Sequence, residues 1–252
     1  MNKLVPPLVL VALSLVAPRL AAAEKPPAEV AAEAEKALSA WETKEARKIL
    51  DPVAGKADSE PAVAAALGRL YAQEKKYDDA AGLLKKASAA RGDDPAPLLT
   101  LAEMYQTAGK TADAEAAWKS AQQAAEKAVA KDPKSAPAHY ALGVSLQRQK
   151  KTDEALASLG KARELDPNLA AATYQIGVTR VMKEEWTPAV AELSAAVEKD
   201  SGNAMAYYYR GLAQQKLGKK DQLVLDFDRF LKLAPNAPEA ERARAVLKAA
   251  KR

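Results

Sequence analysis

The chain has 252 residues, of which 48% are hydrophobic and only 5% aromatic, and it carries a formal net charge of +5. This composition favours a single helical domain rich in Ala and Leu, with a thin core of small side chains. The absence of cysteine excludes disulfide bonds and thiolate chemistry.

The positive charge belongs to the two ends of the chain. Lys3 and Arg19 lie within the first 23 residues, and residues 238–252 carry +3, so residues 24–237 are neutral overall. Nucleic-acid binding needs a basic surface on the folded body. The distribution of charge therefore does not support a nucleic-acid partner.

Residues 1–23 have the pattern of a secretory signal peptide. A positive start is followed by a short apolar run, Leu4–Val16, and by three small residues, Ala21–Ala23. The apolar run is too short to span a bilayer comfortably. We expect cleavage after Ala23 and a periplasmic or secreted protein of bacterial type; an uncleaved N-terminal anchor is the alternative.

Residues 24–60 are interpreted as a short leader followed by a degenerate N-terminal repeat. The second half of this segment fits the pattern of the repeats that follow, but its first half carries Glu33 where Leu is preferred. An end repeat faces solvent on one side and is usually atypical. Asp51–Pro52 predicts that its second helix ends early or is distorted, because proline disfavours a helical residue before it.

From residue 61 a small residue recurs at an interval of 34, lengthened once to 41. These small residues are Gly68, Ala102, Gly143, Gly177 and Gly211. A fixed interval of this length indicates stacked helix–turn–helix units that each pack on their neighbours. We call the predicted units repeats 1 to 5; they span residues 61–94, 95–135, 136–169, 170–203 and 204–237.

The repeats resemble the tetratricopeptide repeat family, whose 34-residue unit has preferred residue types at eight positions. Counted from the first residue of each repeat, the small residues above occupy position 8. Positions 20 and 27, usually Ala, hold Ala in repeats 1 to 4 but Leu223 and Phe230 in repeat 5. The resemblance, which covers residues 61–237, implies an all-α fold: a right-handed superhelical solenoid of stacked helix–turn–helix repeats with a C-terminal capping helix.

Repeat 2 is seven residues longer than the others. Its second helix is predicted to run to about Lys131, where Asp132–Pro133 stops it. Seven residues make nearly two full turns, so the apolar face keeps its phase. We expect the extra turns to protrude as a ledge.

Residues 238–252 are predicted to form the capping helix. Apolar side chains recur there at helical spacing, at Ala243, Val246, Leu247 and Ala250. The basic residues on the opposite face are interpreted as a solvated surface. Contact with a membrane is expected only through this basic helix or through an uncleaved signal segment.

The sequence shows no constellation of catalytic or metal-ligating residues. The single histidine, His139, falls at position 4 of repeat 3, a site that packs between helices. No glycine-rich phosphate loop, convergent set of metal ligands or acid–base pair is evident. We therefore predict no enzymatic activity, no cofactor and no metal.

The family resemblance implies that positions 2, 5, 9, 12 and 13 of each first helix line a concave groove where peptides dock. In repeats 3 to 5 these positions are mostly apolar or aromatic. The candidate groove residues are Tyr140, Val144, Arg148, Tyr174, Val178, Val181, Met182, Met205, Tyr208 and Leu212. The three tyrosines recur at the 34-residue interval, and rings among aliphatic side chains suit an apolar peptide or helix. The alternative is that these rings pack between first helices and serve stability.

These observations predict a non-enzymatic protein-interaction scaffold of the cell envelope that binds a partner peptide or helix in the concave groove of repeats 3 to 5. The alternative is an accessory structural subunit of an envelope assembly or secretion complex, held by its convex face or by the extended helix.

Overall fold

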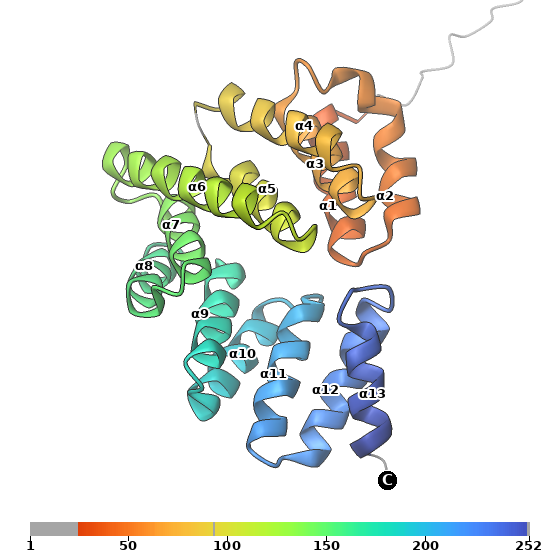
Figure 1. Cartoon of the computed structure of the whole chain (residues 1–252), viewed down its shortest axis with the longest axis vertical. Coiled ribbons are helices and arrows are strands. Elements are labelled where there is room, and N and C mark those ends of the chain that lie inside the picture. The colour runs from red at the N-terminus through yellow and green to blue at the C-terminus, as the bar shows by residue number, and fades with distance from the viewer. Residues whose placement is uncertain (1–24, 93, 251–252) are drawn as a thin grey trace, which may run out of the picture.

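The computed structural model describes residues 25–92 and 94–250, so the predicted signal peptide lies outside the described residues. Within these ranges the chain forms thirteen α-helices and one 3-10 helix, and no strand (Figure 1). The helices are α1 (Pro27–Ser39), α2 (Thr43–Leu50), η1 (Asp51–Lys56), α3 (Pro61–Gln73), α4 (Tyr77–Ala90), α5 (Pro95–Thr107), α6 (Thr111–Lys131), α7 (Ala136–Arg148), α8 (Thr152–Leu165), α9 (Ala170–Met182), α10 (Trp186–Lys199), α11 (Ala204–Lys216), α12 (Lys220–Leu233) and α13 (Ala240–Ala250). None of them is long and apolar enough to cross a membrane.

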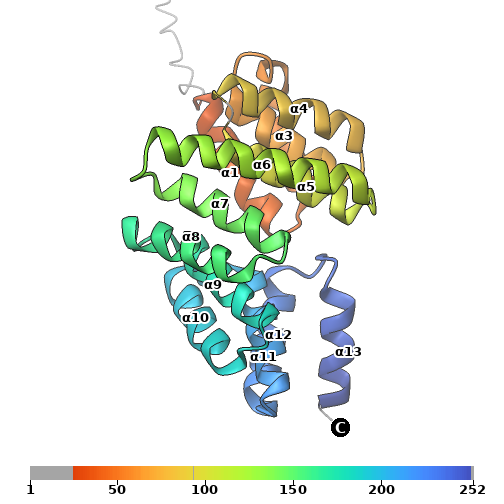
Figure 2. The same cartoon turned by 60° about the vertical axis from the view of Figure 1, so that its left-hand side comes forward.

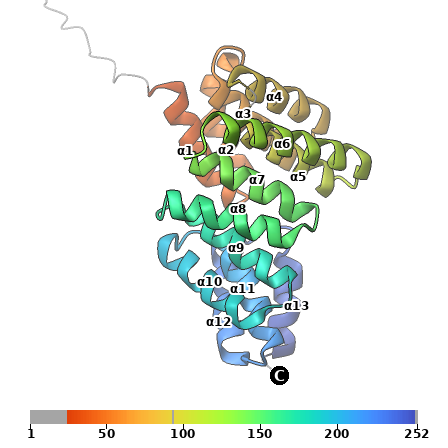
Figure 3. The same cartoon turned by 90° about the vertical axis from the view of Figure 1, so that its left-hand side faces the viewer.

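Consecutive helices pair into hairpins that stack one on the next, as Figure 3 shows from α3 and α4 down to α11 and α12. The first helices, from α1 to α11, contact one another from repeat to repeat. Each second helix packs on the first helix of its own repeat and on that of the next. The first helices therefore line the inner face of an all-α solenoid, as the sequence predicts.

The turn inside every hairpin has the same backbone geometry. One residue of each turn has a positive φ, and it always falls at position 15 of its repeat. These residues are Trp41 (59°), Lys75 (62°), Gly109 (70°), Lys150 (63°), Glu184 (59°) and Gly218 (71°). The N-terminal hairpin of α1 and α2 thus follows the geometry of the other five despite its poor sequence match.

The small residue at position 8 allows the two helices of a hairpin to approach closely. A Cβ atom on Gly143 would lie 2.6 Å from Cγ of Leu159, a side chain at position 24 that is fully buried. Gly177 and Leu193 repeat this arrangement one unit later. Close helix packing over small residues thus builds the thin core expected from the composition.

Two prolines set the ends of second helices where the sequence predicts a change. The α2 helix ends at Leu50, and Asp51–Pro52 opens the 3-10 helix η1. The α6 helix ends at Lys131, just before Asp132–Pro133, and it runs the width of the stack in Figure 2. Ala125 is still buried, but the side chains after it are exposed or half-buried. The last turns of α6 are therefore a largely free surface.

The helix α13 covers the open end of the stack by packing on α12. Its residues Ala240, Ala243 and Leu247 join a cluster that contains Phe227 and Phe230, both fully buried. The superhelix curves so that α13 returns towards α1 and α2 (Figure 1). The α1–α2 hairpin and α13 thus lie on the same side of the stack in this view, one above the other.

Candidate interaction surface

The ten groove residues predicted in repeats 3 to 5 differ in their accessibility. Met182 is exposed. Three are buried: Val144, Val178 and Tyr208. The remaining six are half-buried: Tyr140, Arg148, Tyr174, Val181, Met205 and Leu212.

The ring of Tyr208 lies in the core of the last repeat. It stacks on Phe227 with 5.6 Å between ring centroids, and Phe230 lies 5.1 Å away. Phe230 occupies position 27, where repeats 1 to 4 hold Ala, and this larger ring makes the core of repeat 5 aromatic. Tyr208, with only 3% of its surface exposed, therefore packs within its own hairpin, against α12, and not between first helices as the alternative supposed.

Tyr209, one residue later in α11, takes the place predicted for Tyr208 in the series that begins with Tyr140 and Tyr174. Its ring centroid lies 6.2 Å from that of Tyr174 in repeat 4. We call Tyr140, Tyr174 and Tyr209 the tyrosine ladder. Burial raises the pKa of Tyr140 to about 12 and moves the pKa values of Tyr174 and Tyr209 above their usual range. The three hydroxyl groups thus stay protonated at neutral pH.

A charged pair lies beside the tyrosine ladder. Arg148 of α7 donates a hydrogen bond from Nη2 to Oε1 of Glu103 in α5, at 3.2 Å. Burial is the main cause of the raised pKa of Tyr209. Of the two charges, Arg148 lowers this pKa and Glu103 raises it. The hydrogen bond between Arg148 and Glu103 thus joins repeats 2 and 3 on the inner face.

Several buried polar atoms on the inner helices have no hydrogen-bond partner among the described residues. They include Oε1 of Gln147, Oε1 of Gln175 and Nε of Arg148. The amide nitrogen of Gln147 is satisfied, since it donates to Oγ1 of Thr179 at 2.7 Å. A buried polar atom left unpaired destabilises a fold by about 1–3 kcal/mol. These atoms lie beneath the surface of the first helices and are not presented to solvent.

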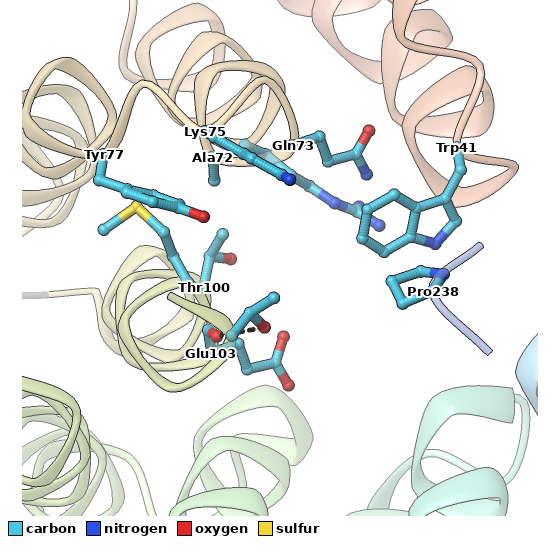
Figure 4. A pocket seen from close by; sticks show the side chains of 11 residues that line it. Trp41, Ala72, Gln73, Lys75, Tyr77, Thr100, Glu103 and Pro238 are labelled. Atoms are coloured by element: carbon cyan, nitrogen blue, oxygen red, sulfur yellow. Dashed lines mark hydrogen bonds between the residues drawn. The ribbon is translucent and has the colours of Figure 1, made fainter. Parts of the chain in front are cut away.

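A cavity of about 230 Å³ opens on the inner face of repeats 1 and 2, which the sequence did not single out (Figure 4). Its walls come from α3, the turn after α3, the first residue of α4, α5, the turn after α1 and the loop before α13. The cavity is lined by Trp41, Arg69, Ala72, Gln73, Lys75, Tyr77, Thr100, Glu103, Met104, Thr107 and Pro238. Arg69, Gln73 and Glu103 hold groove positions 9, 13 and 9 of repeats 1 and 2, but the sequence pattern favours repeats 3 to 5, whose groove positions are mostly apolar or aromatic.

His139 has a local contact, with Nε2 lying 3.0 Å from the carbonyl oxygen of Pro133. In the part of the chain that the structure describes, no three His, Cys, Asp or Glu side chains are grouped so that they could hold a metal ion.

Residues 94–168 match one model of the tetratricopeptide repeat and residues 205–237 match another. The chain contains tetratricopeptide repeats. Among solved structures, it is similar to TTC0263, a thermophilic tetratricopeptide repeat protein of Thermus thermophilus. That similarity has a TM-score of 0.58 and 20% identity, and it covers 76% of this chain and 99% of that one.

Two further solved structures are more distant. MamA is 24% identical with a TM-score of 0.43, over 75% of this chain and 96% of MamA. YrrB, described as a tetratricopeptide repeat protein with an unusual peptide-binding site, is 18% identical with a TM-score of 0.42, over 78% of this chain and 97% of YrrB. The comparison with curated proteins found no match. The likeness to TTC0263 establishes the fold alone.

Proposed function

We propose that this tetratricopeptide repeat protein is a non-enzymatic scaffold that binds an extended peptide or a helix of a partner protein along its inner face. The observation that carries the proposal is the tyrosine ladder on the first helices, in which the rings of Tyr174 and Tyr209 lie 6.2 Å apart. The rings supply apolar area and a defined shape.

The expected affinity is modest. Burying a large side chain completely contributes about 1.5–3 kcal/mol, and the three tyrosines are already half-buried. Association itself costs at least about 4 kcal/mol. The proposed interaction is therefore of micromolar strength, unless the partner also fills the cavity of repeats 1 and 2.

The proposed location is the periplasm or the cell exterior, on the strength of the signal-peptide pattern in residues 1–23. Mass spectrometry of the protein purified from its native host tests this. A mature N-terminus at Glu24 is the expected result, and an intact Met1 in the fractionated envelope indicates an uncleaved anchor.

The peptide-binding proposal is tested by removing two rungs of the tyrosine ladder. We expect the double variant Tyr174→Ala with Tyr209→Ala to recover at least tenfold less partner than wild type when the mature protein is used for affinity capture from envelope extract. Unchanged recovery, with an unchanged circular dichroism spectrum, contradicts the proposal.

Tyr207 provides the matched control, because it lies on α11 two residues from Tyr209 and is also half-buried. Its ring is flanked by Arg210 and Arg229, at 5.4 and 5.9 Å from the ring centroid. We expect Tyr207→Ala to capture the partner as wild type does. Tyr208→Ala is unsuitable because it removes a core ring.

A second candidate function is an accessory subunit held by the extended helix. The α6 helix has 21 residues against 14 in α8, and its last turns are a largely free surface. Deleting residues 125–131 shortens α6 to the usual length. If this surface holds the partner, the deletion abolishes capture and the tyrosine variants retain it.

A further inference from the structure

Trp41 packs on the opposite end of the molecule rather than on its own repeat. It belongs to the turn between α1 and α2, yet the hydrophobic cluster that it contacts is formed by residues 204–247. The cluster of the N-terminal repeats does not include it. In Figure 4 its indole faces the ring of Pro238, which lies in the loop before α13.

The backbone of Trp41 is unusual for an aromatic residue. Its φ of 59° lies in the left-handed region, where a Cβ atom crowds the following carbonyl oxygen. The other five repeats place Gly, Lys or Glu at this position. A large ring is therefore present where the turn itself favours a small or flexible residue, and this strain points to a role for the indole outside the turn.

The other contacts of the α1–α2 hairpin go to its own neighbour in the stack. Its side-chain and carbonyl groups at Glu35, Leu38 and Arg47 form hydrogen bonds with α3 and with the residue that follows α3. Among the described helices, none of α1 to α4 packs extensively against α10 to α13. The packing of Trp41 on the C-terminal cluster, next to Pro238 in Figure 4, thus stands out as a direct link across the opening of the superhelix.

We infer that Trp41 and Pro238 form a latch that joins the two ends of the solenoid and closes one side of its interior. Both residues also line the cavity of repeats 1 and 2, so opening the latch removes one wall of that cavity. A solenoid whose repeats contact only their neighbours flexes readily along its length. One aromatic contact between its ends therefore restrains the whole molecule, whether or not a peptide binds inside.

Single-molecule energy transfer tests the latch directly. Because the chain has no cysteine, Lys48→Cys on α2 and Lys232→Cys on α12 introduce two dye sites, both at exposed positions. With Trp41 present we expect one population of high transfer efficiency. In Trp41→Gly we expect a lower mean efficiency or a second, low-efficiency population.

Trp41→Gly is expected to retain the α1–α2 hairpin, because Gly109 and Gly218 already occupy position 15 in two other turns. Two further variants separate the latch from simple unfolding. Pro238→Ala removes the other side of the contact without touching the N-terminal repeat, and we expect the same loss of transfer. Lys150→Gly, at position 15 of repeat 3, is the matched control and should leave the efficiency at the wild-type value.

The latch is overturned if Trp41→Gly and Pro238→Ala both give the wild-type distribution. It is equally overturned if Lys150→Gly lowers the efficiency as much as Trp41→Gly does, because the effect then belongs to the turns in general.

Discussion

At position 8 of repeat 3, Gly143 leaves room for the side chain of Leu159 on the facing helix. In Gly143→Ala the new Cβ atom would lie 2.6 Å from Cγ of Leu159 and 3.1 Å from its backbone nitrogen. Overpacking of this kind destabilises a protein by about 1–3 kcal/mol. We expect a loss of that size in the free energy of unfolding, measured by urea titration followed by circular dichroism.

Gly160, in α8, gives a control of the same chemical change. Nothing lies within 4 Å of a Cβ atom added there, and the residue is helical. Alanine in a helix is favoured over glycine by up to about 1 kcal/mol. Gly160→Ala should therefore stabilise the protein slightly; equal destabilisation by both variants would show that the close approach at Gly143 is unimportant.

Sequence spacing could predict the small residues but not the direction of individual rings. Gly143 is identified by its interval because every hairpin needs the same close approach. Tyr208 also has the right interval, yet its ring turns into the core because Phe230 replaces an alanine nearby. The orientation of Tyr208, and with it the inward place of Tyr209, depends on neighbours 19 to 22 residues away, which a periodic pattern does not contain.

Among the elements, α7, α9 and α11 carry the tyrosine ladder, and this makes stability sensitive to high pH. An unfolded tyrosine loses its proton near pH 10, whereas buried Tyr140 has a pKa of about 12. Between these values the unfolded state binds fewer protons than the folded state, so stability falls as the pH rises from about 10 to 12. Below about pH 10 the contribution is fully present. We expect loss of helicity in that window, followed by circular dichroism and tyrosinate absorbance.

Replacing Tyr140, Tyr174 and Tyr209 by Phe removes the ionisable groups but keeps the rings. This triple variant should retain its helicity to a higher pH than wild type. If both proteins unfold at the same alkaline pH, other groups govern the transition.

The bounds of the helices follow closely from local sequence. Asp51–Pro52 and Asp132–Pro133 end their helices as predicted, because the effect of proline acts on adjacent residues. The extra length of α6 can also be predicted from the sequence, since seven added residues preserve the phase of its apolar face. The cavity in repeats 1 and 2 was not predicted, because its walls include Trp41 and Pro238, which lie far apart in the sequence.

At the scale of the whole molecule, the stack depends on its last helix. The buried residues of α13 cover Phe227 and Phe230. Deleting residues 240–252 would expose these rings while leaving Pro238 in place. The loss of buried apolar area lowers the free energy of unfolding by about 3 kcal/mol. We therefore expect the midpoint of thermal unfolding to fall by about 6–12 °C. Calorimetry checks the shift, and light scattering should show association through the exposed end.

Lys248→Ala serves as a control within α13, because Lys248 is exposed. It should change the midpoint by no more than a degree or two. A deletion that unfolds at the wild-type temperature would show that α13 does not stabilise the stack.

The order of the hairpins could be predicted from the sequence, but the meeting of the two ends could not. Each hairpin turns slightly relative to the last, and these small rotations accumulate over the whole array. The spacing of residues along the sequence does not give the total of these rotations. Trp41 was therefore not recognised as a contact residue, although its bulk at position 15 sets it apart from the other five turns.

The contact between Trp41 and Pro238 also constrains how the gene can lengthen or shorten. Duplicating residues 136–169 would insert one more repeat and move the indole of Trp41 away from the C-terminal cluster, so that its ring is exposed to water. Deleting one repeat would likewise move α13 out of its position beside the α1–α2 turn. The proposed latch thus ties the number of repeats to the position of α13, in a class of architecture where extra copies are ordinarily tolerated.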